Sequence, residues 1–289
     1  MKNITKNIII IIILLSIYIN RPNIILEIVK GIDLWKNSLF PSIFPILIIS
    51  DFILSTNIIK IISTYLGPIF QKLFKTSKYT SYIFIMSIFS GTPTNAKYIL
   101  DLYQANIISK EESIKILSMC QLYNPLLILT ITPFLNFKDQ LFLIICNILI
   151  NLIVAFINRN YKTNTYNKEF TIQKFNLINS IDKAINIMLL ILGSLITFIT
   201  INALIPIKFP LINGIFEITS GIYSINNYNF YSKYNLLFTS VLLSFGGLSI
   251  LFQIKSIFKD ANLDYSLYYK SRIIHLILFF IFTYIYTLM

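Results

Sequence analysis

The sequence predicts an all-α integral membrane protein that crosses the bilayer several times. Of its 289 residues, 56% are hydrophobic and 12% are charged, whereas soluble domains carry about 25% charged residues. The mean hydropathy of +0.73 is correspondingly high. Several apolar runs also approach the roughly 20 residues that a helix needs to cross the hydrocarbon core. A soluble enzyme is therefore not expected.

The charge balance indicates orientation rather than a nucleic-acid partner. Lys and Arg number 24 against 12 Asp and Glu, a formal net charge of +12. A nucleic-acid-binding protein displays such charge on a polar, water-facing surface, which this composition does not provide. Basic loops stay in the cytoplasm, so we assign four basic stretches to that side: residues 2–6, 60–78, 159–183 and 255–272.

The N-terminal segment, residues 1–30, contains the first expected transmembrane helix and a connection. Residues 4–19 are rich in isoleucine and follow a basic start, but no small-residue cleavage site comes after them. A retained span is therefore expected rather than a removed signal peptide.

The second expected span covers residues 39–54. Pro41 and Pro45 remove backbone donors inside it and predict a bend or a loop leading into the span. Trp35, just ahead of it, fits an anchor at the membrane interface. Residues 58–74 alternate lysines with apolar residues, as in a helix lying on the membrane surface.

Two further apolar segments of the first half are interrupted by polar turns. Residues 79–89 are too short to cross and run into the polar stretch 90–97. Residues 117–135 would span, but polar residues and a proline interrupt them at 121–125. An uninterrupted span follows at 141–157.

The second half has a similar arrangement. A long span is expected at 185–205 and a final one at 273–289. Between them, residues 211–222 are short and contain polar groups, and the apolar run 236–243 ends in the Gly/Ser turn 244–249.

We therefore predict two repeats, residues 31–157 and 176–289, joined by a polar cytoplasmic linker at 158–175. Overlaying the halves places Gly91 on Gly247. With the basic stretches in the cytoplasm, the two interrupted segments enter from opposite sides, so the repeats are inverted. Interrupted segments at corresponding positions of two halves indicate a transporter binding site.

Polar turns at membrane depth require a cavity, because each unpaired backbone group costs several kcal/mol in hydrocarbon. Glycines permit tight turns, hydroxyls cap half-helices or bind ligand, and half-helix N-termini favour carboxylates. Lys97 and Glu217 are charged residues in segments expected inside the membrane. Because a charge there is costly, we expect both residues to have a functional role. The candidate substrate-binding residues are Ser90, Gly91, Thr92, Thr94, Asn95, Lys97, Gln121, Asn124, Glu217, Ser244, Gly246, Gly247, Ser249 and Gln253.

Structural alternatives stand beside these assignments. Lys97 can extend to the cytoplasmic surface, and Glu217 can lie at the interface. His275 is expected to pack near the interface, and Asp51 and Asp101 to mark helix ends.

Neither a cofactor nor covalent chemistry is expected. The single histidine and scattered acids offer no metal-ligand cluster. No P-loop, GxSxG or HExxH motif occurs. Cys120 and Cys146 lie in apolar runs without a disulfide spacing, so both are expected to be reduced.

Five motifs, in their order and spacing, carry a family resemblance over nearly the whole chain from residue 31. They resemble the YlbJ-type sporulation integral membrane proteins, also called stage V sporulation protein V, in the wider group with nucleoside-recognition or Gate domains. The motifs are LFPSIFP at 39–45, SGTPTNAK at 90–97, GIFEITSG at 214–221, FGGLSI at 245–250 with Gln253, and YKSR at 269–272.

The resemblance implies a protein of endospore-forming bacteria that carries dipicolinic acid across the outer forespore membrane. It also implies a fold like that of concentrative nucleoside transporters, with two inverted repeats. Thr92 and Asn95 depart from the family pattern, in which an aromatic residue and a glycine stand at these positions.

Three functions stay open. Dipicolinate is a small planar dianion that suits half-helix N-termini and Lys97. A nucleoside or nucleobase transporter would instead bind its cargo through neutral groups, and a structural protein of the sporulation membranes would carry no cargo. The expected partners are membrane lipids and the anionic metabolite, with a second copy of the chain or other sporulation membrane proteins as further candidates.

Overall fold

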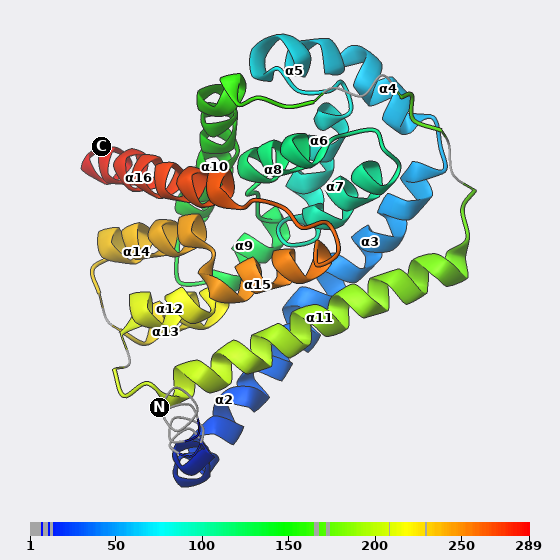
Figure 1. The fold of residues 1–289 in the computed structure, drawn as a ribbon. Helices are drawn as coiled ribbons and strands as arrows, with labels where there is room; N and C mark the ends of the chain where they lie inside the picture. Colours follow the sequence, from blue (N-terminus) through cyan, green and yellow to red (C-terminus); the bar gives the residue numbers. More distant parts are fainter. Residues whose placement is uncertain are drawn as a thin grey trace.

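The computed structural model describes residues 7, 11, 14–164, 168–171, 174–207, 209–228 and 230–289. All regular secondary structure in these ranges is helical (Figure 1). The expected span at 4–19 lies largely outside them. Five helical stretches of the described part are long and apolar enough to cross a membrane, which confirms the multi-pass all-α class: Arg21–Leu54, Phe137–Asn160, Leu177–Leu204, Ser232–Ile257 and Ser266–Leu288.

The second span is longer than expected. Helix α2 (Arg21–Leu34), a π-helical turn (Trp35–Leu39) and α3 (Phe40–Leu54) form one continuous helix of 34 residues. In the π turn, the Phe40 N–H donates to the Trp35 carbonyl five residues earlier. This wider turn precedes Pro41 and makes room for a proline ring that would clash with a regular helix. The expectation of a span starting at residue 39 was therefore wrong.

Trp35 lies in the middle of this continuous helix and contacts another helix of the bundle. Its indole Nε1 donates to the Met188 carbonyl at 3.2 Å. Met188 belongs to α11 (Leu177–Leu204), which packs along both α2 and α3 (Figure 1). The indole is thus a tertiary contact between the two halves of the chain.

The amphipathic stretch forms two short helices, α4 (Ile58–Tyr65) and α5 (Gly67–Phe74). Ile59, Phe70 and Phe74 are buried while the lysines face outward. The apolar face of each short helix therefore packs on the bundle.

The rest of the first half contains two broken helices and one long helix. Each half-helix is about 10–16 Å long at 1.5 Å per residue, too short to cross a core of roughly 30 Å. The elements are α6 (Thr80–Ser90), α7 (Asn95–Gln104), α8 (Lys110–Met119), α9 (Pro125–Ile131), α10 (Phe137–Ile157) and a 3₁₀ turn (Asn158–Asn160).

The second half repeats this order after α11. Two broken helices are again followed by one long helix. The elements are α12 (Pro210–Phe216), α13 (Ile218–Asn227), α14 (Ser232–Phe245), α15 (Gly247–Ile257) and α16 (Ser266–Leu288).

The element order gives a different correspondence from the overlay of Gly91 on Gly247. The pair α6–α7 matches α12–α13, the pair α8–α9 matches α14–α15, and α10 matches α16. Gly/Ser turns of similar sequence recur at several breaks, so a short identity between two of them does not fix the register. With the basic stretches in the cytoplasm, α8–α9 and α14–α15 cross in opposite directions.

The halves interlock through α16, which packs against α8, α10 and α14 (Figure 1). Large apolar side chains cover the outer faces of α10 and α16, among them Ile145, Leu149, Ile273 and Ile277. Exposed apolar faces on helices of spanning length imply contact with membrane lipids.

Candidate functional site

The first break joins α6 to α7 at residues 91–94 and lies directly against the second. Gly91 has a φ of +73°, and a Cβ added to it would lie 2.6 Å from the Asn124 backbone nitrogen. The Thr92 N–H and hydroxyl both donate to the Leu122 carbonyl, at 2.7 and 3.0 Å. The Asn95 amide donates to the Cys120 carbonyl. Glycine at 91 therefore permits the close approach of two irregular segments.

The second break, residues 120–124, is held by two asparagines of α10. Asn151 Oδ1 accepts from the Gln121 N–H at 2.8 Å, and Asn147 Oδ1 accepts from the Tyr123 N–H at 3.3 Å. The amide nitrogens of Asn151 and Asn147 both donate to the Gln121 carbonyl, at 3.2 and 3.3 Å respectively. The side chain of Asn124 caps α9 by accepting from the Leu126 N–H at 2.8 Å. Protein side chains thus satisfy backbone groups that would otherwise be unpaired in this irregular segment.

The sequence predictions missed Asn147 and Asn151. A signal was present, because two amides four residues apart lie on one helix face within an otherwise apolar span. Such buried polar groups in a membrane helix mark an internal contact.

His275 of α16 completes this network. It is buried, and its Nε2 lies 3.2 Å from the Asn151 amide nitrogen and 3.5 Å from that of Asn147. The Tyr268 hydroxyl donates to Gln121 Oε1 at 3.4 Å. His275 is therefore a packing residue between α16 and α10, and its position near the membrane interface stays a prediction.

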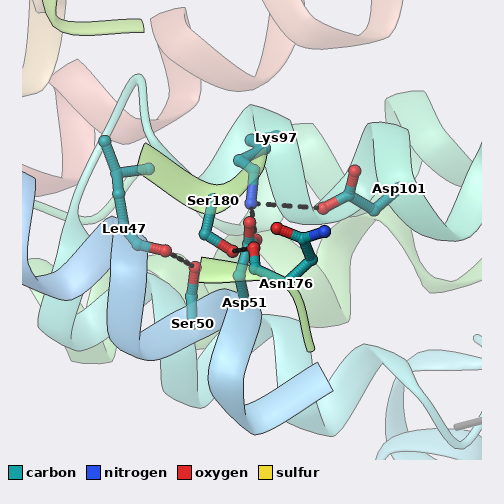
Figure 2. Close-up of polar contacts among 7 residues, drawn as sticks. All are labelled: Leu47, Ser50, Asp51, Lys97, Asp101, Asn176 and Ser180. Atoms are coloured by element: carbon teal, nitrogen blue, oxygen red, sulfur yellow. Dashed lines mark hydrogen bonds and ion pairs between the residues drawn. The ribbon is translucent and has the colours of Figure 1, made fainter. Parts of the chain in front are cut away.

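Lys97 makes ion pairs inside the protein (Figure 2). Its ammonium binds Asp51 of α3 and lies 3.6 Å from Asp101 Oδ2 of α7. The Lys97 side chain is 7% exposed, so it does not reach the surface. Asp51 and Asp101 lie in the last turns of α3 and α7, so both stand at helix ends, as expected. Two carboxylates therefore balance the lysine charge, and its role toward an anion stays a prediction.

Glu217 stands at the third break, between α12 and α13. It is buried and caps α13, accepting from the Ser220 N–H at 2.6 Å and from the Thr219 hydroxyl. This burial means that the Glu217 carboxylate does not extend to the surface of the protein.

The fourth break lies between α14 and α15 and contacts two of the others. Gly246 and Gly247 have φ values of +79° and +73°. A Cβ on Gly247 would lie 3.1 Å from the Gly214 carbonyl oxygen in α12. A Cβ on Gly246 would overlap Nη2 of Arg272 and lie 3.0 Å from the Tyr123 hydroxyl. Both glycines therefore permit contacts that a side chain would block.

Three of the breaks, together with the helix α15 that starts at the fourth, line one small cavity of about 40 Å³. Its polar lining comes from both halves of the chain, while α3, α9 and α11 supply apolar residues. The polar lining residues are Thr92, Tyr123, Glu217, Thr219 and Gln253.

The structure thus brings Thr92, Glu217 and Gln253 of the predicted set to this cavity. Gln253 donates to Ser249 at 3.0 Å and to Ser194 of α11 at 2.6 Å. The other predicted residues lie at the breaks without lining the cavity: Ser90, Gly91, Thr94, Asn95, Lys97, Gln121, Asn124, Ser244, Gly246, Gly247 and Ser249.

Several of these others have local roles. Ser90 and Ser244 donate to carbonyls of their own helices, at 2.9 Å each. Cys120 and Cys146 are buried free thiols, as expected.

One known protein resembles this chain in sequence along most of its length. The sporulation integral membrane protein YlbJ of Bacillus subtilis (strain 168) is 21% identical over 296 aligned positions, which cover 84% of this chain and 72% of that protein. The chain is similar to YlbJ. This similarity confirms the resemblance carried by the five motifs, and YlbJ is named as an integral membrane protein, in agreement with the five apolar helices. No family model matches the chain, and no solved structure matches it.

Proposed function

We propose that this protein carries a small anionic aromatic carboxylate across a membrane during sporulation, with dipicolinate crossing the outer forespore membrane as its cargo. The observation that carries the proposal is that three helix breaks and the half-helix α15 meet at one cavity inside a bundle of spanning length. Irregular backbone at membrane depth is tolerated where it is buried in protein or lines a cavity. Paired breaks in two inverted halves are the arrangement of a substrate site in secondary transporters.

The charge of the cargo is supported by the direction of the half-helices. The N-termini of α7, α9, α13 and α15 all start at the breaks. Helix N-termini present free N–H groups and a partial positive charge, which favour carboxylates. Side chains already cap α9 and α13, whereas α7 and α15 have no side-chain cap.

The transport mechanism follows from the size of the cavity. A space of about 40 Å³ holds about one water molecule, so the cargo enters only when the two halves separate. Alternating access by movement of one repeat against the other provides this opening. The chain carries no nucleotide-binding motif, so a gradient, a partner or trapping of the cargo on the far side supplies the energy.

A nucleoside is the second candidate cargo. Thr92, Tyr123 and Gln253 give the cavity neutral hydrogen-bonding groups, and such groups suit an uncharged base. A carrier for nucleosides would not depend on a cation at the breaks.

The experiment is uptake of radiolabelled dipicolinate into proteoliposomes that contain the purified protein, with uridine and succinate as comparison cargos and empty vesicles as the blank. We expect saturable dipicolinate uptake that excess unlabelled dipicolinate blocks and uridine does not. Uridine uptake without dipicolinate uptake would support the second candidate. Absence of flux for all three cargos would favour a structural role.

A further inference from the structure

Arg272 is a buried cation with no acidic partner among the described residues. It lies in α16 with 7% of its surface exposed. The ion pairs of the described ranges involve Lys30, Lys78 and Lys97 only. The Nη1 atom of Arg272 is buried without a hydrogen-bond partner in the same ranges. Because a guanidinium stays protonated and an unpaired charge inside a membrane protein is costly, this position favours a bound anion.

The surroundings of Arg272 supply further donors. Its Nη2 lies over the α-carbon of Gly246, and the Tyr123 hydroxyl faces the same point. That hydroxyl is also buried, and the Arg272 guanidinium is its charged neighbour. Gly246 is the N-cap position of α15, an eleven-residue helix whose N-terminus has no side-chain cap. A guanidinium, a phenol hydroxyl and a helix N-terminus therefore converge on one point.

A cavity of about 340 Å³ adjoins this point between α15 and α16. Small-molecule sites usually measure about 300–1,000 Å³ and combine apolar walls with a few polar groups. Aromatic walls with one cation suit a planar ring that bears a carboxylate. The lining residues are Phe245, Gly247, Leu248, Leu251, Tyr268, Tyr269, Arg272, Ile273 and Leu276. Ile273 belongs to the outer face of α16, so the cavity reaches the lipid-facing side of this helix.

We propose that Arg272, with the Tyr123 hydroxyl and the N-terminus of α15, binds a carboxylate of the cargo. This assignment rests on the proposed function and names the residue that selects an anion. Lys97 differs because Asp51 and Asp101 already neutralise it. An anionic lipid headgroup would present a phosphate to the same guanidinium, and the experiment separates the two sources.

The test compares wild type with Arg272→Gln in proteoliposomes of phosphatidylcholine alone, measuring dipicolinate Kd and uptake KM. Loss of a buried charge-assisted contact predicts that both constants rise at least about tenfold. Inhibition by the neutral analogue pyridine-2,6-dimethanol stays unchanged, because it lacks the carboxylates. Lys270→Gln is the matched control, an exposed cation two residues away in α16, and retains wild-type constants.

Each result has a distinct meaning. Wild-type constants in Arg272→Gln would overturn this assignment and leave the proposed function standing. Absence of dipicolinate binding and uptake in the wild type would overturn both. If phosphatidylglycerol stabilises the wild type through Arg272 and dipicolinate does not, the occupant is a lipid and the assignment is wrong.

Two conservative variants keep the test decisive if Arg272→Gln does not fold. Arg272→Lys keeps the charge but loses the bidentate guanidinium, and Tyr123→Phe removes only the hydroxyl. We expect both to raise the KM for dipicolinate without changing inhibition by the neutral analogue. Unchanged KM values in both would overturn the assignment.

Discussion

Lys97 and Arg272 are both buried cations, yet their surroundings give them different roles. Lys97 lies between two carboxylates (Figure 2), so removing it leaves negative charge unbalanced. Arg272 has no carboxylate partner in the described ranges, so removing it removes positive charge that the fold does not balance. Substitutions at the two positions should therefore affect different measurements.

Lys97→Met should destabilise the protein by about 3–5 kcal/mol, because it strands a buried carboxylate pair. Thermal unfolding of the detergent-solubilised protein measures this loss. The double variant Lys97→Met with Asp51→Asn should recover part of it, since one stranded charge is removed. An unchanged midpoint together with a raised KM for dipicolinate would show that Lys97 contacts the cargo instead.

Gly246→Ala should abolish most dipicolinate uptake. The added methyl meets the Arg272 guanidinium at a backbone φ of +79°, a conformation that costs a non-glycine residue about 1–2 kcal/mol. We expect uptake to fall at least about tenfold from this displacement of the cation. Gly193→Ala in α11 is the control, since a Cβ there meets nothing within 4 Å. Equal uptake by both variants would contradict the role given to Gly246.

At the scale of elements, side chains of the long helices hold the breaks of the half-helices in place. The segment 120–124 has no regular structure of its own and depends on the amides of α10. The helix α16 then covers those amides with His275. The site is thus supported by two spanning helices and not by the half-helices alone.

Asn151→Leu should destabilise the bundle by about 1–3 kcal/mol, because it leaves the buried Gln121 N–H without its acceptor. Thermal unfolding and amide exchange at 120–124 measure the effect. Asn186→Leu, an exposed asparagine of α11, is the matched control and should leave both unchanged. Equal stability of Asn151→Leu and wild type would mean that another group satisfies this segment.

The sequence allowed the breaks to be predicted because polar and glycine residues interrupt apolar runs at 91–94, 121–125 and 244–249. The continuous helix through Pro41 could not be predicted from the sequence, because the π turn that accommodates the proline ring depends on backbone geometry. Nor could the pairing of Lys97 with Asp51, which stands 46 residues away in sequence. Tertiary contacts decide whether a buried charged side chain is paired with an opposite charge, and the sequence does not show these contacts.

At the scale of the whole molecule, the matching order of elements makes the site symmetric. Broken helices from each half meet at one cavity, and α16 and α11 join the halves. The orientation of the two halves is inferred from the basic stretches. It predicts that residues 162 and 233 lie on opposite sides of the membrane. Only α11 and the α12–α13 pair lie between these two residues in the chain.

Cysteine labelling tests this orientation. In a chain with Cys120 and Cys146 replaced by alanine, Lys162→Cys should react with an impermeant maleimide only when the cytoplasmic face is exposed. Lys233→Cys should react only from the opposite face. Both side chains are exposed in the structure. Labelling of both from one side would contradict the inverted arrangement.

Counterflow tests the central claim, a carrier with one alternating site, most directly. Proteoliposomes loaded with unlabelled dipicolinate are diluted into a trace of labelled dipicolinate. An alternating-access carrier predicts a transient rise of label above its equilibrium level, which Gly246→Ala abolishes and Gly193→Ala retains. A monotonic approach to equilibrium would indicate a channel, and no entry beyond empty vesicles would indicate no transport; either result would contradict the account.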